Sequence, residues 1–138
     1  MEVTLTVKHN KLAKIANLFG GWVDKELEAS IHRLQSFAIQ EAPRASGRLA
    51  QAHRIEKVGN GWRLIVRDVP YWSFVYYGTK PHIIRPKRAK VLHWDNVFAA
   101  YVRHPGTKPN KWMDRAVARE EGHFKGAISH LAQYIETV

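Results

Sequence analysis

Cysteine is absent from this sequence of 138 residues. Its absence excludes disulfide bonds, thiolate metal ligands and cysteine nucleophiles, and it is compatible with synthesis in the cytosol. The sequence has no apolar run near the roughly 20 residues that a membrane-spanning helix needs. Residues 1–12 lack the charged-then-apolar pattern of a signal peptide. We therefore expect no membrane partner. We also expect a core that needs no disulfide or metal ion for its stability, because a chain of this length buries roughly 70% of its unfolded surface.

Acidic residues are scarce relative to basic ones. The chain has 22 lysines and arginines against 12 acidic residues, which gives a formal net charge of +10. Such a balance favours polyanionic partners, namely nucleic acid, an acidic membrane surface or the acidic face of a protein. Several catalytic fingerprints are also missing, among them the Walker loop, the dinucleotide-binding glycine motif, G-x-S-x-G and paired carboxylates.

Aromatic, basic and turn residues are concentrated in residues 71–110. Five aromatic residues fall within 71–77, and the tetrapeptide Gly-Thr-Lys-Pro occurs twice, at 78–81 and 106–109. We interpret each copy as a turn, since glycine and proline punctuate regular structure. Between the copies no acidic residue occurs before Asp95. The rest of the chain is interpreted as the scaffold that holds this segment.

The first half of the chain predicts a strand, a long helix and a hairpin. Residues 3–7 alternate as a strand does, and residues 12–19 have helical spacing that predicts a short helix or turn. A helix is predicted over 22–41, ending before Pro43, with one apolar stripe. That stripe consists of Val23, Leu27, Ile31, Leu34 and Ala38. Residues 42–50 are interpreted as a linker, followed by strands over 49–58 and 62–67 that Gly59-Asn60-Gly61 joins.

The second half predicts further strands and a final helix. An extended segment 71–77 would place Trp72, Phe74 and Tyr76 on one face, and a helical turn would cluster them as well, so both remain open. We expect Trp72 and Phe74 to be buried and some tyrosines to lie at an interface. Strands are predicted over 82–85, 91–94 and 97–103, with a basic loop at 86–90 and a turn at Asp95-Asn96.

The final helix is predicted after Pro109, with Asn110 as its N-cap. Its apolar stripe is Met113, Ala116, Val117, Glu120, Phe124, Ile128, Leu131 and Ile135. Helix, strands and helix in this order predict an α+β fold in a single domain over residues 1–138. We expect an antiparallel sheet of about four to six strands, packed against the long N-terminal helix and the C-terminal helix, with a long basic loop.

Histidines raise two catalytic or metal-binding hypotheses. His82, His93 and His104 are the right residue type for zinc, yet they lack any local ligand spacing, so we favour ordinary loop and strand histidines with no metal and no cofactor. A histidine nuclease would use His82 and His93 as general acid and base, with Arg85 and Lys87 over the phosphate. Sequence alone does not fix that geometry.

The basic and aromatic side chains of this segment predict a binding surface. They would engage phosphates or the acidic face of a neighbouring subunit, and aromatics beside arginine would stack on bases or fill a protein interface. The predicted subunit or DNA contacts are Lys80, His82, Arg85, Lys87, Arg88, Lys90, Arg103 and Lys108. The predicted interface aromatics are Tyr71, Tyr76 and Tyr77.

Four short motifs occur in series along the chain. They are A-P-x-x-S-G-x-L at 42–49, Y-x-x-F-V-x-Y-G-T at 71–79, I-x-P-K-x-x-K-x-L-x-W at 84–94 and H-P-G-T-K-P-N at 104–110. With them the chain resembles the small tail-component proteins of long-tailed bacteriophages, also called tail-completion, head–tail joining or neck proteins. Tyr76 stands where that family often has a glutamate.

This resemblance implies a structural role in the virion and no catalysis. It implies a homo-oligomer, commonly a hexameric ring, at the neck between head and tail, with assembly in the host cytoplasm. The implied partners are the head connector or adaptor and the tail tube or tail terminator proteins, and genomic DNA passes through the lumen. A nucleic-acid-binding module and a histidine nuclease are the alternatives.

Overall fold

The computed structural model describes residues 1–5, 21–44, 46–59 and 61–137, with the backbone alone for 128–137. The helix or turn predicted at 12–19 lies outside this part of the chain. The described chain divides into two compact units. We call residues 1–72 with 111–138 the main unit, and residues 73–110 the inserted unit. The fold class is α+β, as predicted.

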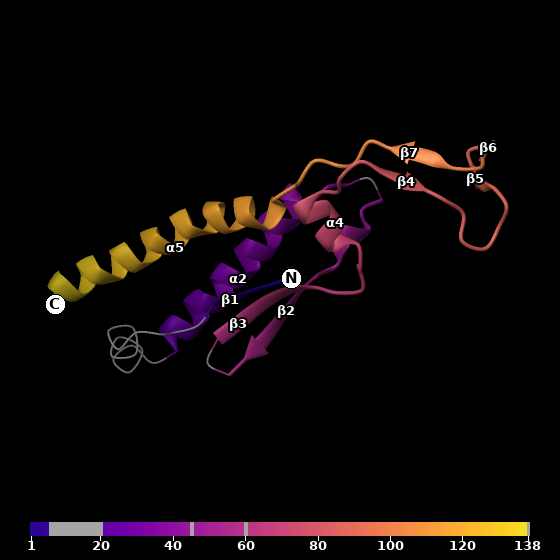
Figure 1. Ribbon diagram of the computed structural model, residues 1–138. Coiled ribbons are helices and arrows are strands. Elements are labelled where there is room, and N and C mark those ends of the chain that lie inside the picture. The colour runs from indigo at the N-terminus through magenta and orange to yellow at the C-terminus, as the bar shows by residue number, and fades with distance from the viewer. Residues whose placement is uncertain (6–20, 45, 60, 138) are drawn as a thin grey trace. The chain divides into compact units, whose positions relative to one another are not determined.

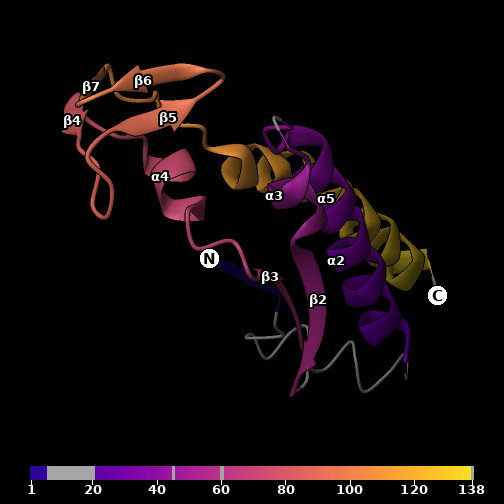
Figure 2. The same cartoon turned by 90° about the vertical axis from the view of Figure 1, so that its right-hand side faces the viewer.

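The main unit consists of a small antiparallel sheet and two long helices (Figure 1). The sheet has the order β1-β3-β2, from β1 (Glu2–Leu5), β2 (His53–Val58) and β3 (Gly61–Val66). Helix α2 (Trp22–Glu41) lies between this sheet and α5 (Trp112–Thr137), as Figures 1 and 2 both show. Arg115 near the start of α5 contacts Glu41 at the end of α2, which shows that the two helices run antiparallel.

Helix α2 confirms the sequence prediction in its bounds and in its stripe. Val23, Leu27, Ile31, Leu34 and Ala38 are all buried. Burying a leucine or isoleucine side chain contributes roughly 1.5–3 kcal/mol, so this stripe is a main source of packing energy in the unit. The helix stops because Ala42 adopts an extended conformation before Pro43.

The β2–β3 hairpin confirms the second predicted strand and shortens the first. Val58 pairs with Gly61, so the loop is Gly59 and residue 60, which lies outside the described residues. The strand predicted over 49–58 begins only at His53, because residues 48–51 form the one-turn helix α3 (Arg48–Gln51). This helix follows Gly47, whose left-handed φ of 73° redirects the chain. The linker predicted at 42–50 is therefore partly helical.

The inserted unit contains four short strands in two separate ribbons. β4 (His82–Ile84) pairs with β7 (Val102–His104), and β5 (Leu92–Trp94) pairs with β6 (Val97–Ala99), both antiparallel. The predicted turn is confirmed, since Asp95 and Asn96 both have positive φ, as a two-residue hairpin turn requires. The strand predicted over 97–103 is wrong as one element, because its two halves pair with different partners. The described antiparallel strands thus form three small sheets, where one sheet of about four to six strands was predicted.

Helix α4 (Trp72–Tyr77) settles the conformation of the aromatic segment and corrects one burial prediction. Trp72 is half-buried, but Phe74 is 62% exposed instead of buried. The reason is geometric: residues two apart share a face of a strand but lie on opposite sides of a helix.

Helix α5 begins at Trp112, two residues after the N-cap predicted at Asn110. Met113, Ala116 and Glu120 are buried as predicted, whereas Val117 is 36% exposed because the face that meets α2 is narrower than the predicted stripe. Trp112, which we did not predict, is completely buried and contacts His53 of β2. The side chains of Ile128, Leu131 and Ile135 lie outside the described part. No helix in the described residues has the length and apolarity to cross a bilayer.

Candidate binding surface

The two Gly-Thr-Lys-Pro copies pair with each other. The Thr79 amide donates to the Thr107 carbonyl at 3.0 Å, and the Thr107 amide donates to the Thr79 carbonyl at 3.1 Å. The two threonine hydroxyls also lie 3.0 Å apart. We call this pairing the threonine clasp. It brings together two segments that are 28 residues apart and closes the inserted unit into one long loop.

Glycine is required on both sides of the threonine clasp. Gly78 and Gly106 have φ values of 76° and 82°, in the left-handed region that favours glycine. A Cβ atom on Gly78 would lie 2.6 Å from the Thr107 carbonyl oxygen, and one on Gly106 would collide with the Thr79 carbonyl oxygen. The repeated tetrapeptide therefore permits two backbones to approach closely.

Next to the clasp, His82 and His104 face each other across β4 and β7. Their rings are stacked with centroids 4.9 Å apart, which leaves no gap for a phosphate between them. Nδ1 of His82 donates to the Lys80 carbonyl, and the Gly106 amide donates to Nδ1 of His104. His93 stacks instead on Phe98, at 4.4 Å between ring centroids. Among the described residues no three histidine or carboxylate side chains converge as metal ligands.

All the predicted basic contact residues belong to the inserted unit and are exposed. The unit has seven basic residues and one acidic residue, Asp95, which gives a net charge of +6. None of the seven forms a salt bridge with a described residue; Arg85 instead lies over the ring of Tyr101 at 5.6 Å. By contrast, Arg33, Arg63 and Arg115 of the main unit each pair with a carboxylate.

The inserted unit also exposes most of its large apolar side chains. None of residues 73–110 is buried, although all of them are described. Of the eleven large hydrophobic side chains exposed in the described chain, nine lie here, with Phe98 the most exposed at 68%. They are Phe74, Tyr77, Ile83, Ile84, Val91, Trp94, Val97, Phe98 and Tyr101. Sequence reasoning missed most of these, because strand-like alternation normally indicates one buried face.

A groove of about 350 Å³ lies between the two ribbons. Its lining residues are Ile84, Leu92, His93, Trp94, Val102 and His104. Ile84 and Val102 are direct cross-strand partners, so their side chains form one wall. Four of the six lining residues are apolar, and the other two are histidines.

The three predicted interface tyrosines do not share one environment. Tyr76 and Tyr77 are adjacent on α4, with perpendicular rings 4.9 Å apart between centroids, and Tyr77 is exposed. Tyr71 belongs to the main unit and is half-buried. The Arg48 guanidinium lies 6.0 Å from the centre of its ring.

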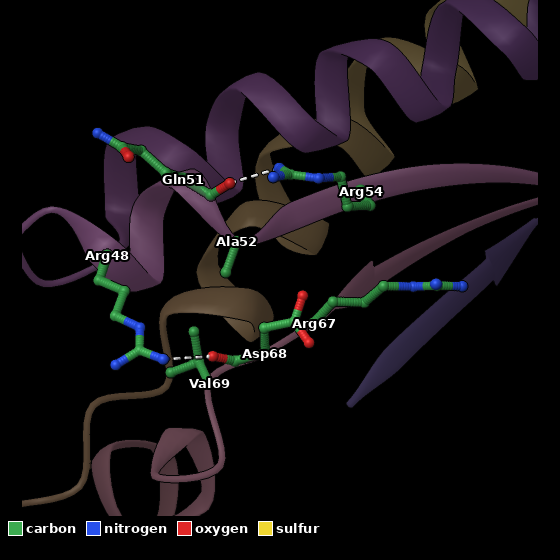
Figure 3. Close-up of a pocket in the computed structure, with 7 residues that line it drawn as sticks. All are labelled: Arg48, Gln51, Ala52, Arg54, Arg67, Asp68 and Val69. Atoms are coloured by element: carbon green, nitrogen blue, oxygen red, sulfur yellow. Dashed lines mark hydrogen bonds between the residues drawn. The ribbon is translucent and has the colours of Figure 1, made fainter.

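A second, polar pocket of about 200 Å³ lies in the main unit (Figure 3). Arginine side chains dominate its lining, but their donors face the protein's own acceptors. Arg48 donates to the Asp68 carbonyl at 3.0 Å, and Arg54 donates to the Gln51 carbonyl. The Arg67 guanidinium points away and pairs with Glu56. This pocket is therefore a weaker candidate than the surface of the inserted unit.

Comparisons with protein-family models, with curated protein sequences and with solved structures gave no match to this chain.

Proposed function

We propose that this protein is a structural subunit of a tailed bacteriophage particle, and that it assembles as a ring at the head–tail junction. In this role it completes the tail or joins it to the head connector, and DNA passes through the ring. The four motifs at 42–49, 71–79, 84–94 and 104–110 support the proposal through their resemblance to neck proteins. The inserted unit supplies the contact surface for a neighbouring protein.

One observation carries this proposal: residues 73–110 contain no buried side chain but expose nine large apolar ones. Isolated two-stranded ribbons are marginally stable in water. Large exposed apolar patches are the usual mark of an interaction site. A unit of this composition gains its burial by association, which is what a subunit of an assembly does.

Ring closure gives a second physical argument. A cyclic assembly built from head-to-tail contacts needs two different surfaces on each subunit. The main unit presents arginines already paired with carboxylates, and the inserted unit presents cations that have no such partner in the part of the chain that the structure describes. The chain thus carries two chemically distinct surfaces.

The test is removal of the chain from the phage whose genome encodes it. We expect separate heads and tails by electron microscopy and a loss of infectious particles, both restored by the wild-type chain supplied in trans. Normal particle yield without the chain, together with its absence from purified wild-type particles by mass spectrometry, would contradict the proposal.

Direct binding of nucleic acid is the second candidate, favoured by the seven exposed cations of the inserted unit. It predicts tight binding of free duplex or single-stranded DNA that weakens steeply with added salt. The assembly proposal predicts only weak binding of free DNA. A titration of the purified chain with labelled DNA at several salt concentrations separates the two.

A further inference from the structure

We infer that the groove between the two ribbons of the inserted unit binds a segment of a different protein that contains both acidic and apolar residues. This segment carries at least one large apolar side chain beside carboxylates. This inference rests on the proposed function, and it specifies the chemistry of the partner that the same surface binds.

The groove fits an apolar side chain. Its volume of about 350 Å³ is at the lower end of typical ligand-pocket sizes, and its apolar lining residues are Ile84, Val102, Leu92 and Trp94. Water gains few hydrogen bonds from such walls, so displacing it by an apolar group is favourable. An indole at the wall is also the type of residue that dominates binding energy at protein interfaces.

The charges next to the groove specify carboxylates. Ile84 ends β4 and Leu92 begins β5, and both residues line the groove. The loop that joins them therefore emerges from the groove walls, and it carries Arg85, Lys87, Arg88 and Lys90 without any acidic residue. Since these cations have no carboxylate partner among the described residues, an acidic segment in the groove would pair with them without breaking a salt bridge that the structure shows.

Charge also argues against a second copy of this chain as the occupant. The whole chain has a net charge of +10, and the inserted unit alone has +6. A second copy would oppose like charges at the groove whether it presented its inserted unit or its main unit, which carries the remaining +4, and like charges cost several kcal/mol where they are juxtaposed. The partner is therefore a different, acidic protein, such as a neighbouring ring in the particle.

The aliphatic content of the surface argues against nucleic acid as the occupant. Nucleic-acid grooves combine cations with aromatic platforms on which bases stack. Here three of the six lining residues, Ile84, Leu92 and Val102, are aliphatic, and a phosphate backbone would leave them uncovered. A protein segment covers aliphatic walls and neutralises cations at the same time.

The experiment is a selection of random peptides, displayed on ribosomes, for binding to the full-length chain. We expect the selected peptides to combine large apolar residues with aspartate or glutamate, and to bind less tightly as salt is raised. Two variants test the site: Trp94→Ser in the groove wall, and Lys87→Glu with Arg88→Glu in the loop. Each should weaken binding of the selected peptide by about tenfold or more.

Matched controls separate the groove from general effects. Ile83→Ser removes an exposed apolar side chain from the opposite face of β4, and Lys25→Glu with Arg44→Glu makes the same charge change in the main unit. Both controls should bind the peptide as the wild type does. Circular dichroism of every variant verifies the fold. If Trp94→Ser disturbs the fold, the loop variant still decides the outcome, because its substitutions are exposed.

Four results would overturn this inference. One is a set of selected peptides without carboxylates, and another is equal binding by the wild type, the groove variant and the loop variant. The third is competition of the peptide by duplex DNA, and the fourth is self-association of the chain that Trp94→Ser abolishes. The chain's presence in the particle neck would then still support the proposed function. Peptide binding by a chain that is missing from the particle would instead refute the function and leave the groove as a site.

Discussion

The indole N–H of Trp112 donates a hydrogen bond to Nε2 of His53, 3.1 Å away, in the core of the main unit. Because Nε2 accepts this bond, the proton of the neutral imidazole sits on Nδ1, which donates to the Ala50 carbonyl at 3.0 Å. Both rings are fully buried, and they link the first residue of α5 to the first residue of β2.

This contact predicts loss of stability at acidic pH. Burial lowers the pKa of His53 below its ordinary value of 6.5, because the charged imidazolium is poorly solvated in the core. Below about pH 6.5 the unfolded chain therefore takes up a proton at His53 that the folded chain does not bind. The contribution of His53 to the free energy of unfolding is complete above about pH 6.5 and declines as pH falls below it. Chemical denaturation at a series of pH values measures this. His53→Gln should flatten the profile between pH 5 and 7, whereas His32→Gln, on the exposed face of α2, should leave it unchanged.

We predict that replacing Glu120 destabilises the main unit far more than replacing its neighbour Glu121. Glu120 is 4% exposed and accepts bonds from the Ser30 hydroxyl at 2.8 Å and from Arg33. Glu120→Ala should destabilise the main unit by roughly 2–4 kcal/mol, since it leaves both donors without their partner. Glu121→Ala removes only an exposed pair with Lys125 and should change stability by less than about 0.5 kcal/mol. Equal free energies of unfolding for the two variants would contradict this assignment.

The threonine clasp predicts that alanine is not tolerated at its glycines. Gly106→Ala should open the clasp, because the left-handed backbone costs about 1–3 kcal/mol with a side chain and the added Cβ meets the Thr79 carbonyl. Faster amide hydrogen exchange at Thr79 and Thr107 is the expected result. Gly122→Ala, at a position of α5 with open space, should instead stabilise its helix by up to about 1 kcal/mol. Unchanged exchange at both threonine amides in Gly106→Ala would show that the clasp does not depend on glycine.

Sequence patterns predicted the elements whose signals are local. The α2 stripe from Val23 to Ala38 and the turn at Asp95-Asn96 each depend on a few neighbouring residues, and both are confirmed. The pairing of the two Gly-Thr-Lys-Pro copies could not be predicted in the same way, because turn chemistry does not specify what a turn lies against. The repeat itself was the only available signal.

The sequence predicted the exposed positive charges of the candidate surface, but it did not predict most of its exposed apolar side chains. The seven cations are exposed as a basic run normally is, so composition was sufficient. Phe74 and Phe98 were not predicted to be exposed, because hydrophobic patterning assumes that a lone chain buries its apolar side chains. That assumption fails where the covering surface belongs to another protein.

Charge reversal in the basic loop predicts an assembly defect without unfolding. Lys87→Glu with Arg88→Glu should reduce the yield of infectious particles, because it places carboxylates opposite the proposed acidic partner. The purified variant should keep the thermal midpoint of the wild type, since both side chains are exposed and form no salt bridge with a described residue. Lys25→Glu with Arg44→Glu is the control of equal charge and should give normal particle numbers. A normal yield from the loop variant would remove this loop from the contact.

The central claim is that residues 73–110 are a surface made to be covered by neighbouring proteins in a particle. An electron cryomicroscopy reconstruction of the intact phage neck tests it most directly. We predict that the chain forms a ring there, with Trp94 and Phe98 buried against an adjacent protein. A neck that lacks this chain, or a ring in which both side chains remain in solvent, would contradict it.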